Sequence, residues 1–135
     1  MSAKEMKHVE FYECEVCGNV MVKLVDGGVT PDCCGAAMKR VKPKSGDAGR
    51  EKHTPIVLVN GERVTVTVGE VAHPMEEDHF IGFAVLENGR GFDVKELQTN
   101  GYPVAQFLLN EDEEAGRVYA WCNKHGLWEA AKREL

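Results

Sequence analysis

From residue 51 onward, apolar runs alternate with turn signals, which is the pattern of short β-strands. Residues 55–59 form an apolar run, and Asn60-Gly61 directly after it is typical of a type I′ hairpin turn. Residues 63–68 alternate strictly between valine and polar residues, as expected for a strand with one buried face. Further strands are predicted at residues 79–86, 92–94, 104–109 and 117–122. Some six short strands at regular spacing indicate an antiparallel β-sandwich.

The segments outside this pattern are shorter and more polar. Residues 20–25 are expected to form a strand, and Asp26-Gly27-Gly28 a turn. Residues 39–50 are polar and locally basic, so we interpret them as a solvated connection. The tail, residues 128–135, is the only segment in which we expect a helix.

The pattern divides the chain into three parts and predicts an all-β protein. Residues 1–40 are a small cysteine-rich module, residues 41–50 a linker, and residues 51–135 the sandwich domain. A length of 135 residues accommodates a small domain followed by a medium one. The first part holds too few apolar residues to fold stably by itself, and a bound metal ion would supply the missing stabilisation.

Composition and charge limit the kinds of molecule that this protein is expected to bind. The formal net charge of −6 argues against duplex nucleic acid, because phosphate contacts need lysine and arginine, but it leaves a small anionic substrate open. No apolar run approaches the roughly 20 residues that cross a bilayer, and the first residues lack the apolar stretch of a secretory signal. We therefore expect a soluble, cytoplasmic protein without membrane contact.

Four of the five cysteines lie in the first part with the spacing of a metal site. Cys14 and Cys17 form a C-x-x-C motif, and Cys33 and Cys34 are adjacent. Four thiolates fit a tetrahedral site for zinc or iron, and the spacing does not choose between the two metals. The adjacent pair is unusual and predicts a strained tetrahedron. The alternative is two disulfides or free buried thiols.

The fifth cysteine and four of the five histidines form a second candidate site. His53 follows the linker, and His73 and His79 bracket a loop stiffened by proline. Cys122 ends the last predicted strand, and His125 follows it by three residues. Five protein ligands exceed the four of a closed structural zinc site, so iron is the best candidate. Four imidazoles in a plane would leave the thiolate axial, with an open position opposite. Each residue taken alone is more often a surface or packing residue.

Two charged residues precede His53, and one histidine stands apart. Lys52 could attract an anion to the metal, and Glu51 could serve as an exchangeable sixth ligand or help to deliver protons. The alternative is that both are solvated loop charges. His8 has no neighbouring ligand residue in the sequence, and we expect it at the surface.

These motifs resemble the desulfoferrodoxin family, the two-iron superoxide reductases, over nearly the whole chain. The cysteine pattern is similar to the family's desulforedoxin-type module, and three further motifs are similar to its catalytic iron site: Glu51-Lys52-His53, His73-Pro74-Met75 followed by His79, and Cys122-Asn123-x-His125-Gly126. The resemblance implies an immunoglobulin-like sandwich and a homodimer.

The resemblance also implies an activity and two iron ions per chain. The first iron would be bound by Cys14, Cys17, Cys33 and Cys34, and the second by four equatorial histidines and axial Cys122, with His125 binding through Nδ1 and the others through Nε2. Lys52 would guide superoxide, and Glu51 would occupy the sixth position in the resting ferric state. Superoxide would be reduced to hydrogen peroxide with electrons from a donor such as rubredoxin. An electron carrier is the main alternative, and a zinc-dependent interaction module is a weaker one.

Overall fold

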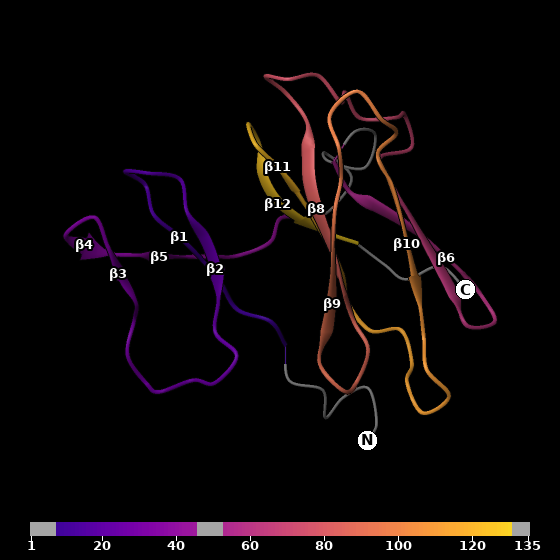
Figure 1. The fold of residues 1–135 in the computed structure, drawn as a ribbon, viewed down its shortest axis with the longest axis horizontal. Coiled ribbons are helices and arrows are strands. Elements are labelled where there is room, and N and C mark those ends of the chain that lie inside the picture. Colours follow the sequence, from indigo (N-terminus) through magenta and orange to yellow (C-terminus); the bar gives the residue numbers. More distant parts are fainter. Residues whose placement is uncertain (1–7, 46–52, 131–135) are drawn as a thin grey trace. The chain divides into compact units, whose positions relative to one another are not determined.

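The computed structural model describes residues 8–45 and 53–130, and these residues form twelve β-strands. No helix occurs in the described ranges, so the all-β prediction is confirmed. The described residues fall into two compact units, which we call the cysteine unit, His8–Lys42, and the sandwich unit, which begins at Pro43 (Figure 1). Within residues 8–45 and 53–130 there is also no helix long and apolar enough to cross a membrane.

The cysteine unit consists of two small antiparallel sheets. In the first, the order is β2-β1-β5, with strands β1 (Phe11–Glu13), β2 (Val20–Val22) and β5 (Lys39–Val41). The second pairs β3 (Asp32–Cys33) with β4 (Ala36–Ala37). One buried cluster of this unit contains Tyr12, Cys14 and Met38, with Cys33 packed against it, and Phe11 is buried as well. So small an apolar cluster supports the expectation that this unit depends on a metal for its stability.

The strand predicted at residues 20–25 is shorter than expected and ends at Val22. Oδ1 of Asp26 accepts hydrogen bonds from Nζ of Lys23 at 2.9 Å and from the backbone N–H of Gly28 at 2.8 Å. This side-chain turn satisfies local donors without a partner strand, so the β-ladder does not continue.

The sandwich unit contains a three-stranded and a four-stranded sheet, both antiparallel. The first has the order β10-β7-β6, with strands β6 (Pro55–Asn60), β7 (Arg63–Val68) and β10 (Val104–Leu108). The second has the order β12-β11-β8-β9, with strands β8 (Ile81–Glu87), β9 (Phe92–Glu96), β11 (Val118–Cys122) and β12 (Gly126–Glu129). In chain order, β6 pairs with β7 and β7 with β10, while β8 pairs with β11 and β11 with β12. These pairings are those of an immunoglobulin-like sandwich.

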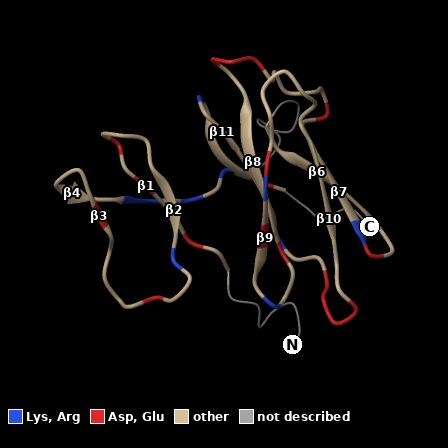
Figure 2. Cartoon of the chain, in the orientation of Figure 1, with Lys and Arg blue, Asp and Glu red and all other residues tan. Residues whose placement is uncertain are grey.

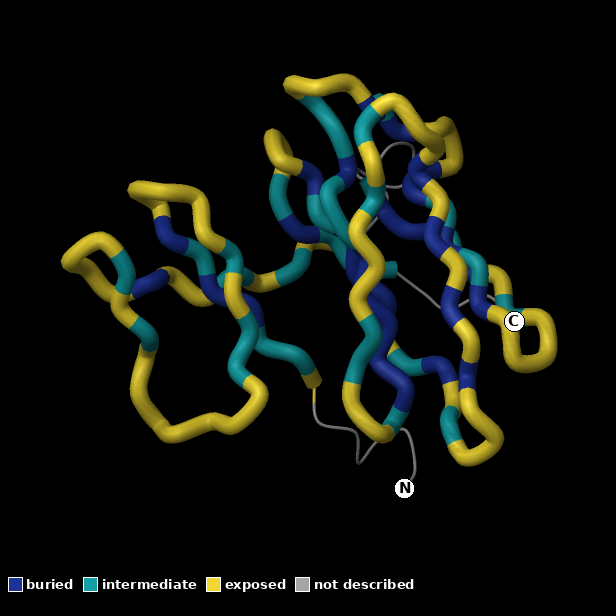
Figure 3. Tube along the Cα trace, viewed as in Figure 1, coloured by how far each residue is buried: buried dark blue, intermediate teal, exposed yellow. Residues whose placement is uncertain are grey.

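The core lies between the two sheets and follows from strand alternation. Val64 and Val66 of β7 are fully buried against Leu86 of β8 and Val118 of β11. Buried and exposed positions alternate along β10 (Figure 3). Most acidic residues lie in loops, including residues 111–114 between β10 and β11 (Figure 2). Strand ends and loops therefore remain available for chemistry.

Two local predictions for the sandwich unit are wrong. The expected helix at residues 128–135 is contradicted at Trp128 and Glu129, which belong to β12 and pair with β11, while residues 131–135 lie outside the described part. The turn after β6 is centred on Gly61 and Glu62, and only Gly61 has a positive φ, of 62°. A positive φ at the first central residue alone fits a type II′ turn.

Candidate metal centres

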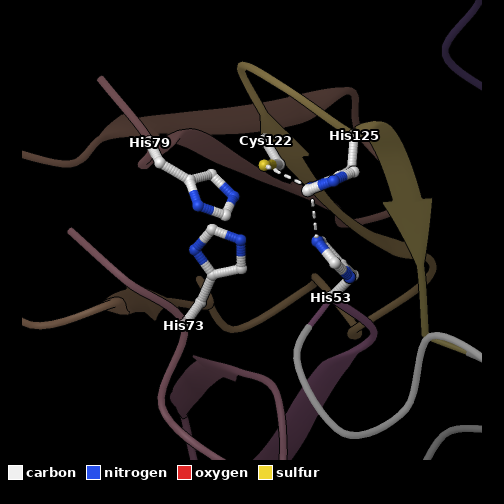
Figure 4. Close-up of side chains that lie close together, drawn as sticks. All are labelled: His53, His73, His79, Cys122 and His125. Carbon is white, nitrogen blue, oxygen red and sulfur yellow. Dashed lines mark hydrogen bonds between the residues drawn. The ribbon is translucent and has the colours of Figure 1, made fainter. Parts of the chain in front are cut away.

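The five residues predicted for the second site come together at one end of the sandwich unit (Figure 4). His53 directly precedes β6, and His73 and His79 lie in the loop from β7 to β8. Cys122 ends β11, and His125 lies in the turn before β12. Each residue offers a nitrogen or sulfur atom, and all these atoms lie within 4.8 Å of one another. We call this group the histidine–cysteine cluster.

The four imidazoles form a closed ring of neighbours. Centroid distances are 5.0 Å from His53 to His73, 4.7 Å from His73 to His79, 5.1 Å from His79 to His125, and 4.7 Å from His125 to His53. Neighbouring rings are inclined by 67° to 77°. The steep inclination of neighbouring rings lets one nitrogen of each ring face a common centre.

The closest ring nitrogens show how the donors converge. Nε2 of His53 lies 3.0 Å from Nδ1 of His125, and that Nδ1 lies 3.7 Å from Sγ of Cys122. Nε2 of His79 is buried and has no hydrogen-bond partner among the described residues. An orphaned buried nitrogen beside other donors fits a metal ligand, since a buried polar atom otherwise costs free energy.

The ionisation and tautomer of two histidines also suit metal binding. Burial and, after it, the neighbouring His73 and His125 lower the pKa of His53 to about 4. His53 is therefore neutral near pH 7. Nδ1 of His73 lies 2.7 Å from the carbonyl oxygen of Pro74, which can only accept, so Nδ1 carries the proton. That tautomer leaves the lone pair on Nε2, the usual arrangement of a metal-binding histidine.

The loop from His73 to His79 is closed by its own backbone and by Met75. His79 and Glu76 exchange two backbone hydrogen bonds of 2.9 and 3.2 Å. The backbone N–H of Ile81 donates to Sδ of Met75 at 3.3 Å, and the carbonyl of Met75 accepts from Asn100 N at 2.6 Å. Met75 therefore ties the loop to β8. Sequence reasoning gave Met75 no role, since a thioether acceptor has no sequence signature.

Cys122 lies opposite a bulge in β8. Trp121 pairs with Phe83 and Cys122 with Ile81, so Gly82 of β8 is the extra residue of a β-bulge. Cys122 itself is fully buried. Asn123 then fixes the turn: its Oδ1 accepts from Phe80 N at 2.9 Å, and its Nδ2 donates to the carbonyl of Asp78 at 3.0 Å. Asn123 therefore links the Cys122–His125 turn to the loop that carries His79.

The four cysteines of the cysteine unit also converge, with all sulfurs within 4.8 Å of one another, and we call them the tetracysteine cluster. Sγ of Cys33 lies 3.7 Å from Sγ of Cys17 and 3.9 Å from Sγ of Cys34. These separations exceed the disulfide bond of about 2.05 Å and match the edge of about 3.8 Å of a tetrathiolate site with metal–sulfur bonds near 2.3 Å. All four are free cysteines, so the disulfide alternative is wrong here. Cys34 has a φ of 54°, in the left-handed region that residues other than glycine rarely adopt, so the backbone of the adjacent pair is strained. The strained tetrahedron itself stays a prediction.

Without a cation, four converging thiols cannot all ionise. The backbone N–H of Cys17 donates to Sγ of Cys14 and lowers the pKa of Cys14 to about 6. Hydrogen bonds first with Cys17 and then with Cys14 raise the pKa of Cys34 to about 12. A divalent ion among the sulfurs reverses this penalty, because a coordinating thiol is deprotonated outright.

The chain joins an antiparallel sandwich with a histidine–cysteine cluster to a small unit with a tetracysteine cluster. This combination defines a class of metalloproteins with two metal centres. The desulfoferrodoxin family profile matches residues 45–131. The chain belongs to the desulfoferrodoxin family. It is 38% identical to a desulfoferrodoxin homologue of Archaeoglobus fulgidus over 122 residues, covering 90% of this chain and 96% of the relative.

Two further relatives cover most of the chain. A desulfoferrodoxin of Nitratidesulfovibrio vulgaris is 40% identical over 121 residues, covering 90% of this chain and 94% of the relative. The crystal structure of a superoxide reductase from Treponema pallidum is 31% identical, with a TM-score of 0.79, and covers 91% of this chain and 98% of that chain. Family membership and the two ligand sets together support two iron ions per chain, one in each cluster.

Three further residues were considered in the sequence. Glu51 and Lys52 lie outside the described residues, so the structure does not place them. His8 is exposed, as expected for a surface histidine.

Proposed function

We propose that this protein is a superoxide reductase that acts at the histidine–cysteine cluster. Superoxide gains one electron and two protons there and leaves as hydrogen peroxide, without formation of dioxygen. The observation that carries the proposal is the closed ring of four imidazoles beside the fully buried Sγ of Cys122. Relatives named superoxide reductase, including the one from Treponema pallidum, support it.

The proposed roles follow from donor chemistry. His53, His73, His79 and His125 would hold the iron together with Sγ of Cys122. When bound, ferrous iron would supply the single electron and a coordination position for superoxide. A buried thiolate keeps its charge close to the metal because no water competes for it.

Glu51 and Lys52 are proposed to act beside the open position. Both directly precede His53 in the sequence. The Lys52 ammonium attracts the superoxide anion, and this steering weakens with ionic strength. The Glu51 carboxylate would help to deliver protons and would serve as an exchangeable ligand of the resting iron.

The cysteine unit is proposed to hold the first iron for structure or electron transfer. The domain boundaries that we propose are residues 1–40 for this desulforedoxin-like module, 41–50 for the linker and 51–135 for the catalytic domain. The sulfur ligands Cys17 and Cys34 are exposed, which favours electron exchange with a partner. The same exposure supports the second candidate function, an electron carrier.

A cytoplasmic homodimer that receives electrons from a rubredoxin-like donor completes the proposal. Free cysteines fit a reducing compartment. Val16, Leu24, Val25 and Val29 of the cysteine unit are 74% to 83% exposed in the single chain. Exposed apolar groups of this kind suit an interface with a second copy.

Rapid mixing of the reduced, iron-loaded protein with superoxide tests the proposal. A superoxide reductase oxidises its second centre rapidly and yields one hydrogen peroxide per superoxide, whereas a carrier shows no rapid oxidation of that centre. A zinc module would be colourless.

We expect Lys52→Ala to slow the capture of superoxide and to weaken the dependence of that capture on ionic strength. Lys95→Ala, an exposed lysine on β9, is the matched control. Unchanged capture by Lys52→Ala across a salt series would contradict the steering role.

A further inference from the structure

Lys44 and Trp128 lie beside the exposed side of the histidine–cysteine cluster. His73 and Cys122 are buried, at 3% and 0% exposure, so the core holds them in place. His53 is only half-buried and His125 is exposed. His79 is half-buried as well, but its loop is tied by backbone hydrogen bonds with Glu76 and by Asn123. His53 and His125 therefore need support from another part of the unit.

The carbonyl oxygen of His125 receives hydrogen bonds from both residues. Nζ of Lys44 donates to it at 3.2 Å, and Nε1 of Trp128 donates at 3.1 Å. A carbonyl has two lone pairs, and two donors, one of them charged, occupy both. The backbone of this exposed ligand residue is thereby fixed in a turn that would otherwise be free to move.

The ring of His53 rests on the same tryptophan. His53 and Trp128 stack with centroids 5.0 Å apart and 19° between the ring planes. Nζ of Lys44 lies 5.4 Å from the centroid of the Trp128 ring, within the range of a cation–π contact. The indole thus contacts one ligand ring, the backbone of a second ligand and a cation.

Backbone pairing holds the two residues together. Lys44 and Trp128 form a parallel β-bridge. Lys44 N donates to the carbonyl of Leu127 at 2.9 Å, and Glu129 N donates to the carbonyl of Lys44 at 2.8 Å. Residue 44 therefore extends the sheet beyond β12 by one bridged position. The side chains of Lys44 and Trp128 gain a fixed separation from this ladder.

We infer that Lys44 and Trp128 act as one positioning pair that holds His53 and His125 in the arrangement required for metal binding. The pair does not bind the metal itself. It restricts the half-buried His53 and the exposed His125, so less conformational entropy is lost when the metal binds. The inference rests on the proposed function only in that the histidine–cysteine cluster holds iron.

The rate of iron loss tests this inference without measuring superoxide reduction. The full-length protein is loaded with ferrous iron without oxygen and mixed with a ferrous chelator, and each centre is followed separately. We expect Trp128→Leu and Lys44→Met to release iron from the histidine–cysteine cluster about 10- to 100-fold faster, the usual effect of losing a residue that orients a ligand. The tetracysteine cluster of the same molecule should release iron at its original rate.

Conservative variants separate the contributions. Lys44→Arg keeps a cation and donors, so its release rate should stay close to that of the original protein. Trp128→Phe keeps the stack but loses the N–H donor, and should fall between Trp128→Leu and the original. Lys42→Met removes another exposed lysine two positions earlier and serves as the matched control. The Lys44→Met/Trp128→Leu double variant should show less than the product of the two single effects, because both act on His125.

Three outcomes would overturn the inference. The first is that both single variants release iron at the original rate. The second is that iron release accelerates equally at both centres, which indicates general destabilisation. The third is that the histidine–cysteine cluster of the original protein binds no iron. Only the last also removes the proposed function. Conversely, if the cluster binds iron and the variants behave as expected but superoxide is not reduced, the proposed function fails and the positioning role stands.

Discussion

The hydroxyl of Tyr119 donates a 2.8 Å hydrogen bond to Oε2 of Glu87, and both side chains are buried in the sandwich unit. β8 runs from Ile81, which pairs with Cys122, to Glu87, so this bond lies at the end of the strand away from the cysteine. Removing the donor leaves a fully buried carboxylate oxygen without this partner. We expect Tyr119→Phe to lower the free energy of unfolding by about 1–3 kcal/mol in urea titrations.

The matched control for this substitution is Tyr102→Phe, since Tyr102 is 85% exposed. It removes the same hydroxyl from a solvated position and should change the unfolding free energy by less than about 0.5 kcal/mol. Equal stability of the Tyr119→Phe protein and the original would show that the bond adds nothing to the fold.

The same pair predicts how stability depends on alkaline pH. Burial, and after it the hydrogen bond to Glu87, raises the pKa of Tyr119 above its usual value of 10.0. In the unfolded chain this tyrosine ionises near pH 10, whereas in the folded protein it stays protonated to higher pH. The folded state then binds more protons, so the unfolding free energy should fall as the pH rises above about 10. Urea titrations between pH 8 and 11 should show this fall, and Tyr119→Phe should reduce its slope.

The lack of a side chain at Gly82 leaves room for the ring of Trp121. A Cβ atom at Gly82 would lie 2.8 and 2.9 Å from two carbons of the Trp121 ring, closer than real contacts allow. Trp121 also stacks on Phe83, with centroids 5.6 Å apart. Gly82→Ala should therefore displace the indole and destabilise the protein by about 1–3 kcal/mol in thermal or urea unfolding.

Gly82 is also the extra residue of the bulge opposite Trp121 and Cys122, which gives Gly82→Ala a second expected effect. Displacement of Trp121 shifts Cys122, the next residue of β11, so the absorption of the second centre should change together with stability. Gly27→Ala is the control, because no described atom lies within 4 Å of a Cβ there. A Gly82→Ala protein with unchanged stability and spectrum would show that the ring moves aside at no cost.

Asn19 is expected to tune the tetracysteine cluster. Its Nδ2 donates to Sγ of Cys33 at 3.6 Å. A donor to sulfur stabilises the more negative, reduced state of an iron–thiolate centre and so raises its reduction potential. Asn19→Leu should lower that potential by about 20–60 mV, the equivalent of one net hydrogen bond. Redox titration measures the shift, with Asn19→Gln as the variant that retains an amide; a potential that stays the same in Asn19→Leu would exclude this tuning.

The sequence predicted the two clusters well because their members stand at strand ends and turns. His73, His79 and Cys122 each follow or precede an alternating segment, so a sandwich brings them to one end. The strand Arg63–Val68 was also predicted with its observed bounds, since strict alternation is the strongest strand signal. Assignment of the ligand roles themselves stays a prediction.

Long-range pairing is what the sequence could not show. Lys44 and His125 are 81 positions apart, and no local pattern indicates that they meet. Trp128 and Glu129 stand next to strong helix formers, yet they join β12 because β11 offers an open edge with free backbone groups. Tertiary pairing overrode local propensity at the tail, and the positioning pair that we infer depends on that same strand.

Cys122→Ser tests the proposed axial thiolate most directly. The side chain is fully buried and its Sγ lies 3.7 Å from Nδ1 of His125. A serine hydroxyl is close in size but is not a soft, negatively charged donor at neutral pH. We expect the loss of the sulfur-to-iron absorption of the second centre and of most superoxide reduction, while the absorption of the tetracysteine cluster persists as an internal control. A Cys122→Ser protein with full activity would remove the thiolate from the mechanism and leave the four imidazoles as the only required ligands.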